Sequence, residues 1–224
     1  MRDLPASVVI VNVHGVGTPV RALDPGEDAA WITVAQLELV LDAAVGRPDV
    51  QLTFDDGNAS DVEIALPRLL ERGLTAEFFI AAGLLGDPGR LDKDGVRELA
   101  RAGMPVSSHG WAHRDWRRLT PPQVDEELVE APRFLSELTG QPVTRHSIPF
   151  GSYDRRVLGR LRQVGAARAF TSDGGRTRRT SWLQARNSLR HTLDEHWVER
   201  VMLGRPTLPQ RARRLAATTV KGIR

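Results

Sequence analysis

Short apolar runs alternate with amphipathic stretches along most of the chain. The runs are rich in Val, Ile and Phe, as buried strands are, whereas the stretches between them repeat apolar residues every three or four positions, as one face of a helix does. The expected strands are Val8–Val13, Val50–Phe54, Ala76–Ile80, Pro105–Ser108, Val143–Ile148, Ala167–Thr171 and Trp182–Ala185. The expected helices cover about 33–44, 60–72, 92–102, 120–139 and 154–164.

Local signals mark where two of these helices begin. Thr33 with Gln36, and Ser60 with Glu63, match the capping box, in which the two side chains of each pair bond the first free backbone amides of a helix. Repeated strand and helix units with short connections predict a parallel sheet covered by helices. Because no repeat or linker divides the chain, we expect residues 1–224 to form a single domain.

The clearest reactive pattern lies in Val50–Ser60, where an apolar strand ends in Asp55, Asp56 and Gly57 directly before a helix. Neighbouring side chains on a strand point to opposite sides. We therefore expect the two carboxylates to have separate roles, one near a metal and the other near a proton. A plain polar turn is the alternative for this stretch, because turns favour Asp and Gly.

Polar residues also follow several other expected strands. The first strand ends at His14, the second at Asp55 and Asp56, the fourth at His109, and the fifth at Pro149–Gly151. In parallel sheets and barrels, reactive residues gather where strands end and loops begin. We therefore expect these groups to lie on one face of the fold.

His109 and His113 are four residues apart, a spacing that puts two imidazoles on the same face of a helical turn. With a carboxylate from another strand, they would form a two-histidine, one-carboxylate metal site that leaves positions open for water and substrate. The pair alone is weak evidence, because histidines at this spacing also occur on surfaces and in cores. The strand-end carboxylates make a metal the favoured interpretation.

Three motifs in this order resemble the polysaccharide deacetylase family, which shares a domain with the rhizobial chitooligosaccharide deacetylases. Thr53–Gly57 is similar to its first motif, His109 with His113 to its second, and Pro149–Asp154 to its third. The resemblance covers about residues 8–186. It implies an incomplete or distorted α/β barrel of seven or eight strands and the removal of acetyl groups from an N-acetylated sugar or polysaccharide.

The resemblance also implies roles for individual residues. Asp56, His109 and His113 would hold a divalent metal, usually zinc, with cobalt or nickel as alternatives, and Asp55 would be the general base. The residues expected to contact or support the substrate are Pro149, Phe150, Gly151, Tyr153, Trp111 and Arg186. For Trp111, and for Trp116 beside it, packing at the rim is as good an interpretation as stacking on a sugar.

The sequence departs from the family pattern at three places. Gly110 stands where many members have Ser or Thr, and Ser147 stands where an arginine often orients the base. The late motif with a general-acid histidine is not recognisable, and His191 is a poor candidate for it. A non-catalytic relative that only binds carbohydrate is therefore one alternative.

Two residues offer replacements for the missing groups. His14 resembles the early histidine of poly-N-acetylglucosamine deacetylases, in which the third-motif arginine is also absent, and it is our candidate acid; a hydrogen-bonded loop histidine is the alternative. Arg186 ends the last expected strand, where it would orient Asp55 or form a surface ion pair.

A further alternative concerns the reaction. The same fold and metal would then hydrolyse another amide, as in the allantoinase-like and cyclic-imide-hydrolysing relatives of this family.

Composition adds few constraints. The 224 residues are 41% apolar, enough for a sizeable core, and the absence of cysteine excludes a disulfide framework. All but two of the 31 basic residues are arginine, which suggests a coding bias. A basic cluster near the end comprises Arg211, Arg213, Arg214, Lys221 and Arg224. We interpret it as the solvated face of a helical tail from about residue 205, and we expect no nucleic-acid partner.

No apolar run reaches the roughly 18 residues that span a bilayer. The N-terminal run is short and β-branched and lacks a cleavage site, so we interpret it as the first strand and not as a signal peptide. We therefore expect a cytoplasmic protein.

Overall fold

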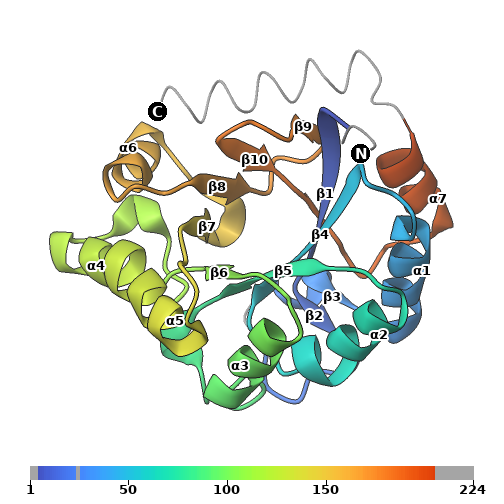
Figure 1. The fold of residues 1–224 in the computed structure, drawn as a ribbon, viewed down its shortest axis with the longest axis horizontal. Coiled ribbons are helices and arrows are strands. Elements are labelled where there is room, and N and C mark those ends of the chain that lie inside the picture. Colours follow the sequence, from blue (N-terminus) through green and yellow to red (C-terminus); the bar gives the residue numbers. More distant parts are fainter. Residues whose placement is uncertain (1–4, 24–25, 205–224) are drawn as a thin grey trace.

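A curved sheet of short strands forms the centre of the molecule, and helices surround it (Figure 1). The computed structural model describes residues 5–23 and 26–204, so the expected basic tail lies outside the described residues. The strands are β1 Ser7–Val13, β2 Gly15–Val16, β3 Trp31–Ile32, β4 Val50–Asp56, β5 Ala76–Ile80, β6 Val106–Ser108, β7 Arg145–Ser147, β8 Arg168–Thr171, β9 Arg176–Arg178, β10 Leu183–Ala185 and β11 Asn187–Ser188.

The main sheet has the strand order β10-β8-β7-β6-β5-β4-β1-β11, and every neighbouring pair in this order is parallel. β9 pairs antiparallel with β1, and β2 and β3 form a separate small sheet. Parallel pairing places the carboxyl ends of the main strands on one side of the molecule. The predicted parallel sheet is thus confirmed.

A single residue, Arg186, separates β10 from β11, although these strands lie at opposite ends of the sheet order. β10 pairs with β8, whereas β11 pairs with β1. The chain therefore crosses the gap between the first and last strands and nearly closes the sheet, which confirms the predicted distorted barrel. The predicted strand Trp182–Ala185 is only the first half of this crossing segment.

The helices lie outside the sheet, and most of them bury apolar residues on one face (Figure 1). They are α1 Val34–Ala44, α2 Leu66–Glu71, α3 Lys93–Arg101, α4 Pro121–Asp125, α5 Ala131–Thr139, α6 Arg155–Gln163 and α7 Glu195–Val198. The π-helical segments are η2 Asp61–Ala65, η5 Glu126–Glu130 and η7 Glu199–Leu203, and the short 3₁₀ turns are η1 Asp28–Ala30, η3 Ala82–Leu84, η4 Trp116–Arg118 and η6 Pro149–Gly151. No helix within these described ranges is long and apolar enough to cross a membrane.

Alternation along the strands separates two apolar regions. Val9 and Val11 of β1 belong to the core between the sheet and the helices, whereas Val8 and Ile10 belong to a smaller cluster with Phe79 of β5 and Phe170 of β8. A parallel strand that is buried on both faces has an almost continuous run of apolar residues in its sequence. This explains why Val8–Val13 shows no alternation of apolar and polar residues except at Asn12.

The two predicted capping boxes have different outcomes. Thr33 and Gln36 form one at the start of α1, as expected. Ser60 makes no cap, because its hydroxyl instead accepts a hydrogen bond from the backbone N–H of Val16 at 3.3 Å. The helix there begins with the π-helical segment η2, so the prediction for Ser60 and Glu63 is wrong.

Candidate functional site

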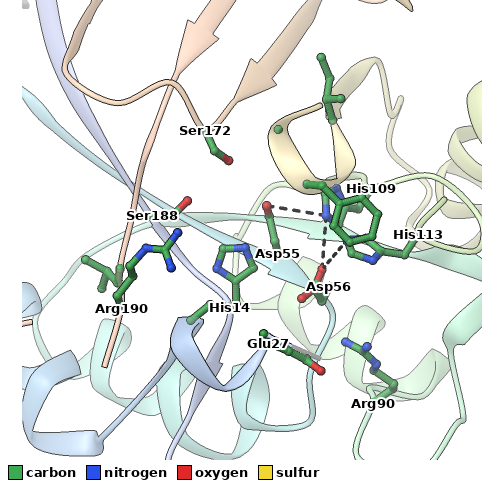
Figure 2. Close-up of a pocket in the computed structure, with 16 residues that line it drawn as sticks. His14, Glu27, Asp55, Asp56, Arg90, His109, His113, Ser172, Ser188 and Arg190 are labelled. Carbon is green, nitrogen blue, oxygen red and sulfur yellow. Dashed lines mark ion pairs between the residues drawn. The ribbon is translucent and has the colours of Figure 1, made fainter. Parts of the chain in front are cut away.

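A cavity of about 310 Å³ opens at the carboxyl ends of the central strands (Figure 2). β1 leads to His14, β4 contributes two aspartates, and the segment after β6 contributes two histidines. Its lining includes His14, Asp55, Asp56, His109, His113 and Phe150. The structure thus brings residues from distant parts of the sequence to one face, as their strand-end positions predict.

Both aspartates face this cavity. Asp56 has a φ of 78°, and Gly57 follows with a φ of 68°, so the extended backbone of β4 ends at the second aspartate. A residue other than glycine in this left-handed region is disfavoured by roughly 1–2 kcal/mol. The turn breaks the alternation of the strand, so the expectation that Asp55 and Asp56 point to opposite sides is wrong. The two carboxylates nevertheless have different partners.

Asp56, His109 and His113 form a compact group of candidate metal ligands (Figure 2). Asp56 Oδ1 lies 3.3 Å from His109 Nε2 and 3.4 Å from His113 Nε2. Within the described part of the chain, this buried oxygen has no hydrogen-bond partner. One carboxylate and two imidazoles so close together fit a divalent cation such as zinc, and three protein ligands leave a position for water or substrate.

The two histidines are held in different ways. His109 Nδ1 lies 2.9 Å from the backbone oxygen of Ser147, which leaves Nε2 facing the carboxylates. Burial lowers the pKa of His113 to about 4, although the Asp56 charge acts in the opposite direction. The His113 imidazole is therefore neutral at pH 7, the state that binds a metal.

The segment between the two histidines is not helical, so the predicted helical turn is wrong. Gly110 has a φ of 81° and His113 a φ of 51°, and an irregular loop joins them. The convergence of the imidazoles therefore depends on loop conformation and not on helical periodicity. The ring centroids of His109 and His113 lie 4.9 Å apart.

Asp55 is enclosed by hydrogen-bond donors. Arg186 binds it in a bidentate manner, with Nη1–Oδ1 and Nη2–Oδ2 distances of 2.7 Å each. Asn12 Nδ2 donates to Oδ2 at 3.0 Å and Ser147 Oγ donates to the same oxygen at 3.2 Å. Burial opposes ionisation of Asp55, but the charges of Arg186 and His109 hold its pKa below the usual range. Asp55 is therefore a fixed, ionised carboxylate.

Arg186 explains one departure from the family pattern. Its side chain is fully buried, so the surface ion pair considered for it is wrong. Arg186 Nη2 also donates to Ser147 Oγ at 2.6 Å, and the guanidinium stacks over Phe79 at 5.2 Å from the ring centroid. The guanidinium that Ser147 cannot provide thus comes from the segment that closes the barrel. Asn12, the one polar residue in the apolar run Val8–Val13, is the sequence signal for this buried polar network.

The two candidate acids occupy different places. His14 lines the cavity and faces the two aspartates in Figure 2, and its buried Nδ1 has no hydrogen-bond partner in the described residues. His191 is exposed, and its backbone N–H donates to the Ala29 oxygen at 3.0 Å. It does not appear among the described residues that line the cavity.

The other predicted substrate-binding residues divide into two groups. Phe150 is 66% exposed at the cavity edge, its ring 4.4 Å from that of His113, and Gly151 also lines the cavity. Pro149 is buried beside them, and Ile148 lines the cavity in its place.

Trp111, Trp116 and Tyr153 are not among the described residues that line the cavity. Trp111 packs edge-on against Phe134 and is half-buried, whereas Trp116 is fully buried. Tyr153, which follows the Pro149–Gly151 turn of the third motif, donates a hydrogen bond of 2.7 Å to Asp173 Oδ2.

The fold and the site define an α/β barrel with a candidate Asp-His-His metal centre at its strand ends. The model for the family described as Polysaccharide deacetylase matches residues 42–169. The chain therefore belongs to the polysaccharide deacetylase family.

Individual relatives agree with this assignment. The YxkH protein of Bacillus subtilis (strain 168) is 27% identical over 156 residues, 70% of this chain and 56% of that protein. A chitooligosaccharide deacetylase of Bradyrhizobium is 29% identical over 124 residues, 54% of this chain and 55% of the relative. The chain thus spans about half the length of these relatives. The fold is similar to that of the Streptococcus pyogenes deacetylase PplD, solved with acetate, with a TM-score of 0.72, 17% identity, and coverage of 88% of this chain and 99% of PplD.

Proposed function

We propose that this protein is a metal-dependent hydrolase that removes the acetyl group from an N-acetylated sugar. The observation that carries the proposal is the convergence of Asp56, His109 and His113 with a second, separately bonded carboxylate, Asp55, in one cavity. Membership of the polysaccharide deacetylase family supports the same reaction. The donor set favours zinc, with cobalt or nickel as alternatives.

The chain's own residues supply the proton transfers in this proposal. A metal bound by Asp56, His109 and His113 would polarise the acetyl carbonyl and acidify a water molecule. Asp55 accepts one proton from this water molecule as the water oxygen attacks the carbonyl carbon. Arg186 keeps the Asp55 carboxylate oriented for this step. The carbon–nitrogen bond then breaks as a protonated His14 donates its proton to the leaving nitrogen, so that acetic acid and a free amine result. The proton taken by Asp55 then passes to His14, which restores both groups for the next turnover.

The cavity supports a substrate group about the size of one sugar. Its volume of about 310 Å³ lies at the lower end of the range for ligand pockets. The exposed ring of Phe150 at its edge offers an apolar face for a sugar ring. The same small volume favours a second candidate function, hydrolysis of another small carbon–nitrogen substrate such as a cyclic amide.

The test combines metal analysis with product analysis. Purified protein is stripped with a chelator, supplied with zinc, cobalt or nickel, and assayed for acetate release from a panel of N-acetylated sugars and for opening of cyclic amides. We expect acetate release that depends on the metal and is abolished in Asp56→Ala, with His191→Ala as the matched control. Metal-independent release would contradict the proposal, and cyclic-amide opening without acetate release would favour the second candidate. Failure to bind any divalent metal would indicate a non-catalytic relative.

A further inference from the structure

The loop between the two histidines, residues 110–112, lacks regular secondary structure of its own. It begins at Gly110 with a φ of 81° and leads to His113 with a φ of 51°. A left-handed residue other than glycine persists only where its surroundings enforce it. Contacts from outside the loop must therefore select the conformation that directs His113 toward Asp56.

Glu127 of η5 supplies those contacts. Its Oε2 accepts a hydrogen bond from the Trp111 N–H at 2.8 Å, and its Oε1 accepts one from the Ala112 N–H at 3.0 Å. Arg114 Nη1 lies 3.0 Å from Oε1, and Trp116 Nε1 lies 3.3 Å from Oε2. The Glu127 side chain is fully buried, so water cannot replace these bonds. One carboxylate thus satisfies both backbone amides that immediately precede His113.

Gly110 makes this approach possible. A Cβ atom at Gly110 would lie 2.1 Å from Glu127 Oε2, closer than any real contact allows. The glycine that replaces the Ser or Thr of many family members is therefore the partner of the buried carboxylate. On its other side the loop is fixed by the Ala82 and Gly83 amides, which donate to the Gly110 and Trp111 oxygens at 2.9 and 2.8 Å.

We propose that Glu127 is a positioning residue for the candidate metal centre, because its buried carboxylate holds the loop between His109 and His113 in the conformation that brings both imidazoles to Asp56. His109 is fixed independently, since it follows β6 directly and its Nδ1 lies 2.9 Å from the Ser147 oxygen. Within the described residues, the His113 ring has no such hydrogen bond to a backbone oxygen, so its position depends on the loop. The inference rests on the metal site of the proposed function.

The test measures metal affinity and not catalysis. In Glu127→Gln an NH₂ group replaces one carboxylate oxygen and cannot accept a hydrogen bond from a backbone N–H, so one of the two loop bonds is lost. Loss of an outer contact that orients a metal ligand reduces metal affinity by about 10- to 100-fold. We expect a loss of that size in zinc titrations at a temperature where circular dichroism shows every variant folded. We also expect the visible spectrum of the cobalt-loaded variant to differ from that of the parent protein.

Glu126→Gln is the matched control, because Glu126 neighbours Glu127 and also pairs with Arg114, but within the described residues it makes no hydrogen bond to the backbone of residues 110–112. It should bind zinc as the parent does. If Glu127→Gln does not fold, Glu127→Asp, which retains both oxygens on a shorter side chain, takes its place with the same expected loss. If the folded Glu127 variant has the zinc affinity and the cobalt spectrum of the parent protein, this inference is overturned, but the metal site of the proposed function is not. Absence of zinc binding in the parent protein would overturn the metal site and the inference together, whatever the acetate assay shows.

Discussion

Two adjacent aspartates differ sharply in their hydrogen bonding. Asp55 accepts from Arg186, Asn12 and Ser147, whereas Asp56 Oδ1 has no donor in the described residues and faces two imidazoles. A carboxylate surrounded by donors is oriented but not free to bind a metal through all of its lone pairs. The unpartnered oxygen is the better metal ligand, which supports the division of roles proposed from the sequence.

Replacement of Asp55 tests its proposed role as base. Asp55→Asn should retain zinc, because none of the three candidate ligands changes, but it should lower turnover on the deacetylation substrate by about 10²- to 10⁴-fold. Zinc content by elemental analysis and kcat by acetate release are the measurements, with the exposed Asp87→Asn as control. An Asn variant with parental turnover would remove Asp55 from this role.

Comparison of two histidines tests the proposed acid. His14→Ala should lower kcat while zinc content stays unchanged, and the loss should shrink for substrates whose leaving amine is a weak base and needs less protonation. His191→Ala should keep parental kinetics, because its exposed side chain lies outside the described cavity lining. The opposite result, a silent His14→Ala and an inactive His191→Ala, would assign the acid to the late histidine.

Among the elements, the crossing segment β10–β11 joins barrel closure to the site. Its central residue, Arg186, is fully buried and links Asp55 on β4, Asn12 on β1 and Ser147 on β7 through hydrogen bonds. The same residue therefore fills the interior of the barrel near the strand ends and holds the candidate base. A change there should affect stability as well as activity.

Removal of the Arg186 guanidinium leaves the buried Asp55 carboxylate without the positive charge that pairs with it. Arg186→Met should therefore lower the free energy of unfolding by about 3–5 kcal/mol. Urea denaturation of the metal-free protein measures the difference. Arg97→Met, which breaks an exposed ion pair with Asp94 on α3, should have little effect. Equal stability of Arg186→Met and the parent protein would show that the buried pair makes no net contribution.

The stability of the whole molecule should depend on pH through His146. This residue packs beside Trp116, and burial lowers its pKa to about 4. An unfolded histidine has a pKa near 6.5. Between these two values the unfolded chain binds the proton and the folded chain does not, so stability falls as the pH is lowered.

Lowering the pH from 7 to 5 should therefore cost the folded state on the order of 2 kcal/mol through His146. His146→Leu should lose less stability than the parent protein over this interval, as measured by urea denaturation at both pH values. The exposed His196→Gln serves as control and should keep the parental pH dependence. Identical pH dependence of His146→Leu and the parent would show that His146 titrates normally in the folded state.

The sequence by itself determined the order of strands and helices and the strand ends at which reactive residues lie. These features are patterns among neighbouring residues, as in the apolar run Val8–Val13 and the strand end at Asp55–Gly57. Such local patterns predict secondary structure without knowledge of the fold. The motif resemblance added the family and the candidate ligands, because residue types at fixed positions are visible without a fold.

Only the tertiary structure decided how these residues meet. The left-handed backbone at Asp56 turned both aspartates into one cavity, and barrel closure placed Arg186 against a residue 131 positions away in the sequence. Glu127 reached the histidine loop from a helix, and Trp116 packed into the interior. Each outcome depends on long-range packing and on the burial of polar groups, and neither is recorded in the spacing of residues along the chain.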